Sequence, residues 1–245
     1  MGIDRGAVRA VVFDYGNTLI PFGDAELEAY GRSLAAALER RYGPLDLERF
    51  FALRAVSRFA PYIGDPPTYR ENDLAAITVR LVRELYGRDP SQGELDDLLR
   101  VRFDSFVGVV RAPDYATDLL GRLGRRFPLG LLSNYPDARA IRASVDTLGW
   151  TAFFRSVVVS GDLGYVKPHP ITFATVLQEL GLKAREVVFV GDNWLADVQG
   201  AKRVGMQMVH MRQWIPPERF EPQDGDHAPD AIIGHLSELE AVLAG

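Results

Sequence analysis

Four segments of the sequence place reactive or polar side chains beside apolar runs. Asp14 follows one run, Ser133 and Asn134 follow a second, and Asp192 follows a third. The fourth segment holds Lys167, with two prolines in the next three positions to restrict the backbone. A carboxylate at the end of a buried strand can act as a nucleophile or a metal ligand. A hydroxyl, a backbone amide and a lysine suit an oxyanion, so the four segments together indicate chemistry on a group such as phosphate.

Each segment also has a purely structural interpretation. Asp14 suits a turn or a helix cap, Ser133 suits a helix N-cap, and Lys167 suits the surface. Asp197, five residues after Asp192, suits either a helix cap or a group that orients the site. For Ser133 taken alone, the cap is the simpler interpretation. The function therefore depends on whether the surrounding elements bring the four segments together.

Six short apolar runs predict strands that are buried on both faces, because their hydrophobicity is nearly continuous rather than alternating. The runs are Val8–Phe13, Leu129–Leu132, Ser156–Ser160, Val187–Val190, Met206–Met211 and Ala231–Ile233. Helical patterns fall near residues 114–126, 137–148, 170–181, 195–204 and 236–243. This alternation predicts an α/β fold, with a doubly wound, mostly parallel sheet covered by helices.

Residues 22–110 interrupt the alternation with helical patterns and no convincing strand. Leu27, Tyr30, Leu34 and Leu38 recur at helical intervals, and a second set with this spacing runs through residues 74–85. Ser91-Gln-Gly-Glu94 predicts a capping box at the start of another helix. We expect about four helices in this insertion.

The insertion predicts the domain organisation. We expect a catalytic core of residues 1–20 and 112–245 and an all-helical cap domain of residues 21–111. Because the insertion follows the first strand, it would lie at the carboxyl end of the sheet, where open α/β folds bind ligands. An independent helical bundle is the alternative.

Composition excludes several classes of protein. The 245 residues are 47% hydrophobic and 25% charged, which is ordinary for a globular protein. The net charge of −5 gives no general basic field for nucleic acid. The chain has no cysteine, so disulfides and thiolate chemistry are excluded. We find no signal peptide and no run of about 18 apolar residues, and a cytoplasmic protein is the expectation.

The order of the motifs adds more than any motif alone. This order resembles that of the haloacid dehalogenase superfamily. It runs from a strand followed by Asp14, through the helical insertion, to a strand followed by Ser133, then the Lys167-Pro pair and a strand followed by Gly191-Asp192. The resemblance covers residues 7–19 and about 113–245. The predicted cap resembles the family's helical cap in position and length only.

The resemblance implies a magnesium-dependent phosphatase acting on a small phosphorylated molecule. Asp14 would be the nucleophile that forms an aspartyl-phosphate, with Lys167 as a second catalytic group. The implied Mg²⁺ ligands are Asp14, Asp192 and the backbone carbonyl of Gly16. The implied phosphoryl-binding groups are Thr18, Ser133, the backbone amide of Asn134 and Lys167. Asp197 would support the metal ligands. Phosphoryl transfer depends mainly on positioning and charge neutralisation, and this set offers both.

One position departs from the family pattern. Phosphatases of this family usually carry an aspartate two residues after the nucleophile, where it protonates the leaving group, but this chain has Gly16. Loss of a general acid typically costs about 10²–10⁴-fold in rate. Asn17 stands where the family usually has glycine, and asparagine tolerates the positive φ that such a turn needs.

Members that lack the acid provide alternatives. Dehalogenases need no metal and have serine where this chain has Asp192, and phosphonoacetaldehyde hydrolases use a cap lysine, which residues 20–112 lack. P-type ATPases have a membrane part that this chain lacks. Three interpretations stay open: a phosphatase with weakened or substituted acid catalysis, a non-enzymatic protein that binds a phosphorylated ligand or a partner, and, least favoured, a dehalogenase.

The predicted cap carries no readable specificity code, so the substrate and the oligomeric state stay open. Five of its side chains have the chemistry to meet a substrate anion: Arg54, Arg58, Tyr62, Tyr69 and Arg70. Arg54 and Arg58 are four residues apart and share a helix face. In an arginine-rich protein a solvated arginine face is the favoured interpretation.

Overall fold

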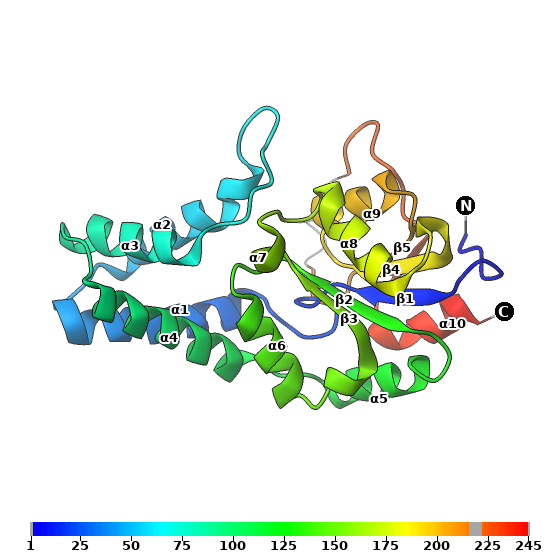
Figure 1. Ribbon diagram of the computed structural model, residues 1–245, viewed down its shortest axis with the longest axis horizontal. Helices are drawn as coiled ribbons and strands as arrows, with labels where there is room; N and C mark the ends of the chain where they lie inside the picture. Colours follow the sequence, from blue (N-terminus) through cyan, green and yellow to red (C-terminus); the bar gives the residue numbers. More distant parts are fainter. Residues whose placement is uncertain (1, 216–221, 245) are drawn as a thin grey trace.

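The computed structural model describes residues 2–215 and 222–244 and contains one six-stranded sheet (Figure 1). All the strand pairs are parallel, in the order β3-β2-β1-β4-β5-β6. The strands are β1 (Ala10–Phe13), β2 (Leu129–Ser133), β3 (Phe154–Val159), β4 (Val187–Gly191), β5 (Gln207–Met211) and β6 (Ala231–Ile233). Each overlaps one predicted run, so the predicted α/β fold is confirmed.

Helices cover both faces of the sheet, and alternate residues of β1 show why its sequence is continuously apolar. Val11 and Phe13 join the apolar cluster on one face, whereas Ala10 and Val12 join the cluster on the other. The first face is covered by α5 (Asp114–Leu123), α6 (Ala138–Thr147), η6 (Leu236–Glu238) and α10 (Leu239–Leu243). The second is covered by α8 (Pro170–Leu180), the π-helix η4 (Trp194–Gln199) and α9 (Gly200–Arg203).

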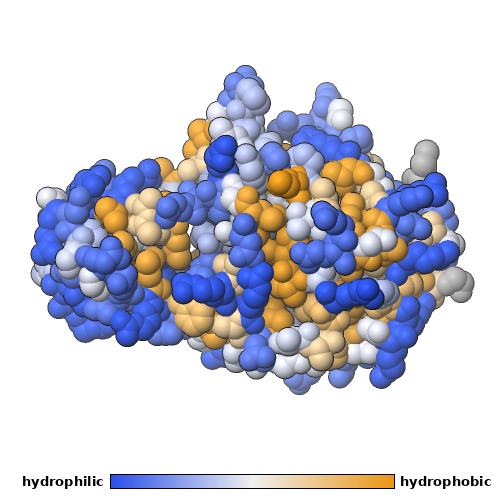
Figure 2. Space-filling view, viewed as in Figure 1, coloured by the Kyte–Doolittle hydropathy of each residue, from blue (hydrophilic) through white to orange (hydrophobic). Residues whose placement is uncertain are grey.

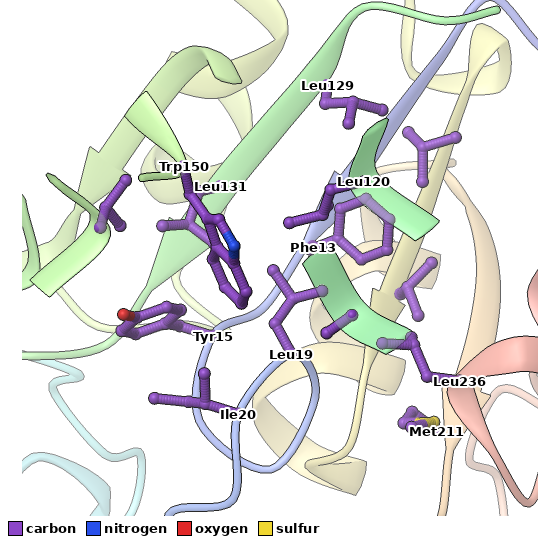
Figure 3. Close-up of a cluster of buried hydrophobic side chains, with 14 of the residues drawn as sticks. Phe13, Tyr15, Leu19, Ile20, Leu120, Leu129, Leu131, Trp150, Met211 and Leu236 are labelled. Atoms are coloured by element: carbon purple, nitrogen blue, oxygen red, sulfur yellow. The ribbon is translucent and has the colours of Figure 1, made fainter. Parts of the chain in front are cut away.

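The larger cluster fixes the start of the loop after β1 (Figure 3). Tyr15 is buried, its ring meets Trp150 edge-on at 6.5 Å between centroids, and its hydroxyl bonds the Ser144 hydroxyl at 2.8 Å. Leu19 and Ile20 of the same loop are fully buried. Burial of one such side chain contributes about 1.5–3 kcal/mol, so the backbone around Asp14 is held by packing on both sides.

The predicted insertion, residues 21–111, folds into four α-helices beside the sheet (Figure 1). They are α1 (Asp24–Tyr42), α2 (Leu47–Phe59), α3 (Leu74–Tyr86) and α4 (Gln92–Val109), with the short 3₁₀ helix η1 (Ala60–Tyr62) after α2. The predicted capping box is confirmed, because the Ser91 hydroxyl accepts from Glu94 N while the Glu94 carboxylate accepts from Ser91 N. The four helices enclose their own apolar cluster, which includes Leu34, Leu38, Phe50 and Leu98.

The outer surface of these inserted helices is mainly hydrophilic, whereas apolar residues gather toward the middle of the molecule (Figure 2). None of the described helices is long and apolar enough to span a bilayer.

The inserted segment also touches the rest of the chain away from its two ends. Tyr69 O accepts from Val166 N at 2.8 Å, and Glu71 N donates to Gly164 O at 3.0 Å. The Glu71 carboxylate accepts a hydrogen bond from the hydroxyl of Ser160, which begins α7 (Ser160–Leu163). These contacts bring the segment between α2 and α3 against the loop that carries Lys167.

Two predicted helices differ from the structure in their internal form. The helix predicted near 195–204 is a π-helix followed by α9, since the Asn193 carbonyl accepts from both Asp197 N at 2.9 Å and Val198 N at 3.1 Å. The helix predicted near 236–243 begins as a 3₁₀ turn. The remaining 3₁₀ turns of the described residues are η2 (Thr151–Phe153) and η3 (Ala184–Glu186).

Candidate active site

Three adjacent strands deliver polar groups to one edge of the sheet. Asp14 follows β1, Ser133 ends β2 and Asp192 follows β4. The strand order reverses between β1 and β4, because β1 connects onward to β2 on one side while β4 continues to β5 on the other. Open α/β sheets bind ligands in the crevice at such a point. Three of the four predicted segments therefore converge through strand topology alone.

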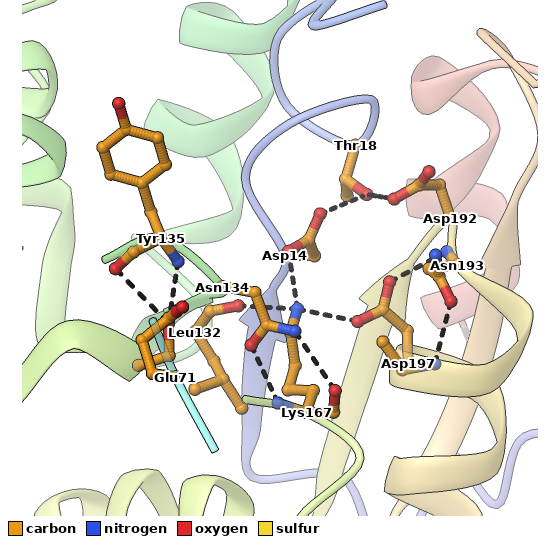
Figure 4. Close-up of polar contacts among 12 residues, drawn as sticks. Asp14, Thr18, Glu71, Leu132, Asn134, Tyr135, Lys167, Asp192, Asn193 and Asp197 are labelled. Carbon is orange, nitrogen blue, oxygen red and sulfur yellow. Dashed lines mark hydrogen bonds and ion pairs between the residues drawn. The ribbon is translucent and has the colours of Figure 1, made fainter. Parts of the chain in front are cut away.

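Lys167 reaches the same point from the loop between α7 and α8 (Figure 4). Its Nζ lies 2.6 Å from Asp14 Oδ1, 2.7 Å from Asp197 Oδ1 and 3.0 Å from the Leu132 carbonyl oxygen. Burial alone would lower the pKa of Lys167, but the Asp14 and Asp197 carboxylates outweigh burial and raise it. The ammonium group stays charged at neutral pH, so Lys167 acts here as a fixed cation. The surface interpretation is excluded, because Lys167 is buried.

Thr18 lies between two carboxylates. Its hydroxyl is 3.4 Å from Asp14 Oδ2 and 3.5 Å from Asp192 Oδ1 (Figure 4). Both distances are long for a hydroxyl hydrogen bond, and one proton can serve only one acceptor at a time. Burial, together with the Asp14 charge, raises the pKa of Asp192 well above its usual range. The two carboxylates are therefore close enough to repel each other.

The carboxylates outnumber the cation beside them. Oxygens of Asp14, Asp192 and Asp197 lie within 4.8 Å of one another, and Lys167 is the single cation that pairs with them among the described residues. Hard divalent cations prefer carboxylate and carbonyl oxygens. Both the donor atoms and the excess negative charge fit Mg²⁺.

The three carboxylates are not equally available to a metal. Asp197 is committed to protein partners, since Oδ1 pairs with Lys167 and Oδ2 accepts from Asn193 N at 2.9 Å. Burial raises the pKa of Asp197 to about 6 against the opposing effect of Lys167. Asp14 Oδ1 also pairs with Lys167, but Asp14 Oδ2 and Asp192 Oδ1 have only long contacts with the Thr18 hydroxyl. These two oxygens are therefore the better candidate ligands.

Asn193 is a structural residue that the sequence analysis did not single out. Its side-chain oxygen accepts from Ala196 N at 2.8 Å, so Asn193 caps the π-helix η4, and the interpretation of Asp197 as the cap is wrong. Asparagine is a preferred N-cap, and its position just before the helical pattern was an available signal. Because the cap falls at Asn193, the Asp197 side chain folds back toward Lys167.

Asn134 fixes the loop that carries Lys167. Its side-chain oxygen accepts from Lys167 N at 2.8 Å, and its Nδ2 donates to the Lys167 carbonyl at 3.2 Å and to the Tyr62 hydroxyl at 2.9 Å. Ser133 is buried and is not a helix cap, because α6 begins five residues later with Asp137 as its cap. The capping interpretation of Ser133 is therefore wrong.

The turn after Asp14 survives the change to asparagine. Asn17 adopts φ of 58°, and its side-chain oxygen accepts from Phe22 N at 2.9 Å. Phe22 also fills the space beside Gly16, where an added Cβ would lie 3.1 Å from Phe22 Cβ. The position that lacks the expected aspartate is thus packed against an aromatic residue.

A cavity of about 970 Å³ opens over these groups and is lined by both the sheet edge and the inserted helices. Its lining includes Asp14, Gly16, Ser133, Asn134, Lys167, Asp192 and Asp197 together with Arg54, Arg58 and Tyr62. Arg54 is half-buried, so the solvated-face interpretation is wrong for this arginine. Tyr69 and Arg70 are not among the lining residues, and the exposed Arg70 lies over the Tyr165 ring at 4.9 Å.

Comparison with known proteins decides the family. Residues 8–205 match the family model of the haloacid dehalogenase-like hydrolases. The chain belongs to this family. It is therefore a haloacid dehalogenase-like hydrolase, and its strand order and polar strand ends agree with the resemblance seen in the sequence.

Relatives of this hydrolase include both phosphatases and dehalogenases. A glyceraldehyde 3-phosphate phosphatase from Methanopyrus kandleri is 29% identical over 237 residues, which cover 96% of this chain and 97% of the relative. A phosphoglycolate phosphatase from Xylella fastidiosa is 29% identical over 203 residues, covering 81% of this chain and 77% of the relative. The crystal structure of a 2-haloacid dehalogenase from Pseudomonas syringae pv. tomato superposes with a TM-score of 0.72 at 25% identity, covering 97% and 98% of the two chains.

Proposed function

We propose that this hydrolase is a Mg²⁺-dependent phosphatase that acts on a small phosphorylated molecule through an aspartyl-phosphate on Asp14. The observation that carries the proposal is the arrangement of Asp14, Lys167 and Asp192 at the switch point of the sheet, with the negative charge in excess. An arrangement with surplus carboxylates suits a divalent cation and a phosphate dianion, whose charges offset each other. The inserted helices, which line the same cavity, would serve as the cap.

In this proposal Asp14 attacks phosphorus with one carboxylate oxygen, and the bond from phosphorus to the substrate oxygen breaks. Lys167, whose Nζ is 2.6 Å from Asp14 Oδ1, orients the nucleophile and neutralises phosphoryl charge. Asp197 keeps Lys167 in place. Ser133 and the Asn134 amide bind the phosphoryl oxygens, and water then releases phosphate from Asp14. Thr18, which the sequence analysis placed among the phosphoryl-binding residues, is fully buried and is not among the cavity-lining residues, so its hydroxyl would act on the Asp14 carboxylate rather than on the phosphoryl group.

The metal would be held by carboxylate oxygens of Asp14 and Asp192 and by the backbone carbonyl of Gly16. When bound, Mg²⁺ would supply charge neutralisation for the phosphoryl group.

The leaving oxygen lacks the usual acid, because Gly16 has no side chain to donate a proton. We therefore expect better turnover of acyl and aryl phosphates, whose leaving groups are already acidic, than of alkyl phosphates. A water molecule or a cap residue would supply the proton for alkyl substrates.

Asp192 separates the proposal from dehalogenation. Dehalogenases of this family have serine at that position, whereas a second carboxylate there suits a metal-dependent phosphatase. The two phosphatase relatives add support, since each is named for a small phosphate monoester.

The test is phosphate release from an aryl phosphate and a panel of phosphometabolites, with Mg²⁺ and with EDTA. We expect turnover that EDTA abolishes and that Asp14→Asn lowers by at least about 10³-fold, because the nucleophile is lost. Asp146→Asn, an aspartate on α6 away from the cavity lining, is the matched control and should retain wild-type rates. Halide release from 2-haloacids without metal, or turnover that survives Asp14→Asn, would contradict the proposal.

A further inference from the structure

Arg102 on α4 is a buried cation without a carboxylate partner. It is only 6% exposed, and no acidic group lies within ion-pair distance of it in the described part of the chain. Its Nη1 donates to the Tyr30 hydroxyl at a long 3.4 Å, and its Nε has no hydrogen-bond partner. An unpaired buried charge is costly, so this guanidinium has unused capacity to bind an anion.

Arg54 on α2 places a second cation beside the first. Its guanidinium carbon lies 4.8 Å from the centre of the Tyr30 ring, and residues 2–215 and 222–244 offer it no carboxylate partner either. Burial lowers the pKa of Arg54, and the nearby Arg102 charge lowers it further. Both arginines contact Tyr30 and are partly shielded from solvent, so their positive charges repel each other, and an anion bound between them would offset this repulsion.

The backbone makes room for this pair. An ideal Cβ built on Gly31 of α1 would lie 2.0 Å from Arg54 Nη1 and 2.5 Å from Phe51 Cε1. Glycine inside a helix costs about 1 kcal/mol relative to alanine. At this position the missing side chain lets Arg54 and Phe51 lie against α1, next to the Tyr30 ring.

The arginines face the same cavity as the reaction centre. Arg54 and Arg102 line the cavity that Asp14 and Lys167 also line. Tyr135 follows Asn134 in the chain, and its ring points away from Lys167 (Figure 4). The Tyr135 hydroxyl donates to the Tyr30 hydroxyl at 3.4 Å. The Tyr135 side chain thus extends from the loop after β2, which would bind the phosphoryl group, to Tyr30, which both arginines contact.

We propose that Arg54 and Arg102 bind a second anionic group of the substrate, a carboxylate, so that the preferred substrate is a small phosphorylated carboxylic acid. This inference rests on the proposed phosphatase function and assigns its substrate class. The guanidinium fork matches the planar carboxylate in a bidentate manner. The substrate would supply the counter-charge that the protein does not.

The test uses three substrates with one carbon skeleton and one phosphate: 3-phosphoglycerate, glyceraldehyde 3-phosphate and glycerol 3-phosphate. They differ only in carrying a carboxylate, an aldehyde or an alcohol at C1. We expect kcat/KM for 3-phosphoglycerate to exceed that for glycerol 3-phosphate by about 10- to 100-fold, as for hydrogen bonds to a charged group. Arg102→Met and Arg54→Met should each move this ratio toward one.

Two further variants separate a specific role from a general loss of structure. Arg100→Met removes an exposed arginine of the same helix and should leave the ratio unchanged. Gly31→Ala keeps both charges but displaces Arg54, so it should lower the ratio as the arginine variants do. Circular dichroism melts of all variants identify any that fail to fold.

A binding measurement distinguishes failure of this inference from failure of the proposed function. In the Asp14→Asn variant, calorimetric titration should give a lower Kd for 3-phosphoglycerate than for glycerol 3-phosphate, with the difference lost in the Arg102→Met background. Absence of turnover on every phosphate would overturn the phosphatase proposal. Turnover with equal kcat/KM for 3-phosphoglycerate and glycerol 3-phosphate would overturn only the carboxylate subsite. Glycerol 1,3-bisphosphate, which carries a second phosphate in place of the carboxylate, is a further substrate for comparison. A higher kcat/KM for this compound than for 3-phosphoglycerate would also overturn the carboxylate subsite.

Discussion

At the scale of single residues, position 16, where phosphatases of this family usually carry the general-acid aspartate, is in contact with Phe22. An added Cβ at Gly16 would be 3.1 Å from Phe22 Cβ, and Phe22 itself packs on Phe106 with 5.3 Å between ring centroids. The tight contact is with the Phe22 Cβ, whereas the ring atoms Cγ and Cδ1 lie at ordinary distances of 3.7 and 3.9 Å from the added Cβ. A carboxylate at position 16 therefore needs the Cβ of residue 22 to move or to be removed.

We predict that Gly16→Asp combined with Phe22→Gly, which removes the contacting Cβ, raises turnover of alkyl phosphates relative to aryl phosphates. The added carboxyl group can protonate a poor leaving group, which is worth about 10²–10⁴-fold where it works fully. An aryl leaving group needs little protonation, so its rate should change less. Rates for glycerol 3-phosphate and 4-nitrophenyl phosphate measure the effect. Phe22→Gly alone is the control, and an unchanged ratio in the double variant would argue that another group already supplies the proton.

The side chains whose convergence could be predicted from the sequence are those at strand ends. Asp14, Ser133 and Asp192 each end or follow an apolar run, and parallel strands must bring such ends to one edge. Arg102 gave no such signal, because its burial comes from packing of α4 against α1 and from the shared contact with Tyr30. Helical periodicity places a residue on a face but does not say which neighbour that face meets.

The glycine that ends β4 determines how Asp197 of the following π-helix η4 reaches the site. Gly191 ends β4, and an added Cβ there would lie 2.6 Å from Asp197 Cγ. The bare backbone of the strand end is thus what allows Asp197 to fold back and pair with Lys167.

We predict that Gly191→Ala lowers both stability and kcat. Overpacking of this kind costs about 1–3 kcal/mol, and displacement of Asp197 would leave Lys167 less well oriented. Urea denaturation and steady-state kinetics measure the two effects. Gly130→Ala is the matched control, because an added Cβ there would press on Val12 of β1 and Val176 of α8 at 3.1–3.2 Å. It should cost stability while kcat is retained, and equal kcat values for the two variants would count against a positioning role of Gly191.

The elements themselves were largely predictable, and their contacts were not. All six strands and the helical nature of the insertion follow from local apolar patterns. The approach of residues 69–71 to residues 164–166 depends on backbone hydrogen bonds between segments almost a hundred residues apart, which leave no periodic trace in either sequence. The π-helix was also missed, because apolar periodicity does not reveal the hydrogen bond from Val198 N to the Asn193 carbonyl that defines its wider turn.

For the molecule as a whole, the surplus of buried carboxylates links metal binding to stability. Asp14 and Asp197 pair with the one cation Lys167, and Asp192 has no ion-pair partner among the described residues, so the metal-free protein carries uncompensated repulsion. The raised pKa of Asp192 means that its ionised form destabilises the folded state at neutral pH.

We predict that Mg²⁺ raises the melting temperature and that Asp192→Asn removes the rise. At a hundredfold excess over Kd the metal should add about 2.7 kcal/mol, or about 5–10 °C for a chain of this size. Asp192→Asn should also melt higher than the wild type in EDTA, because one repelling charge is gone. Calorimetry with and without Mg²⁺ measures both effects, with Asp146→Asn as the control. A rise of equal size in Asp192→Asn would exclude this residue as a ligand.

The central place of β1 in the sheet has a consequence for how the chain acquires its structure during synthesis. β1 lies between β2 and β4, which begin at residues 129 and 187. Once the ribosome releases β1, one of its hydrogen-bonding edges has no partner until β2 has emerged at residue 133, and the other has none until β4 has emerged at residue 191. The inserted helices enclose an apolar cluster of their own and are complete far earlier. During synthesis from the N-terminus, the inserted helices can therefore fold while β1 is still an unpaired apolar strand. We expect a chaperone to bind at this exposed strand.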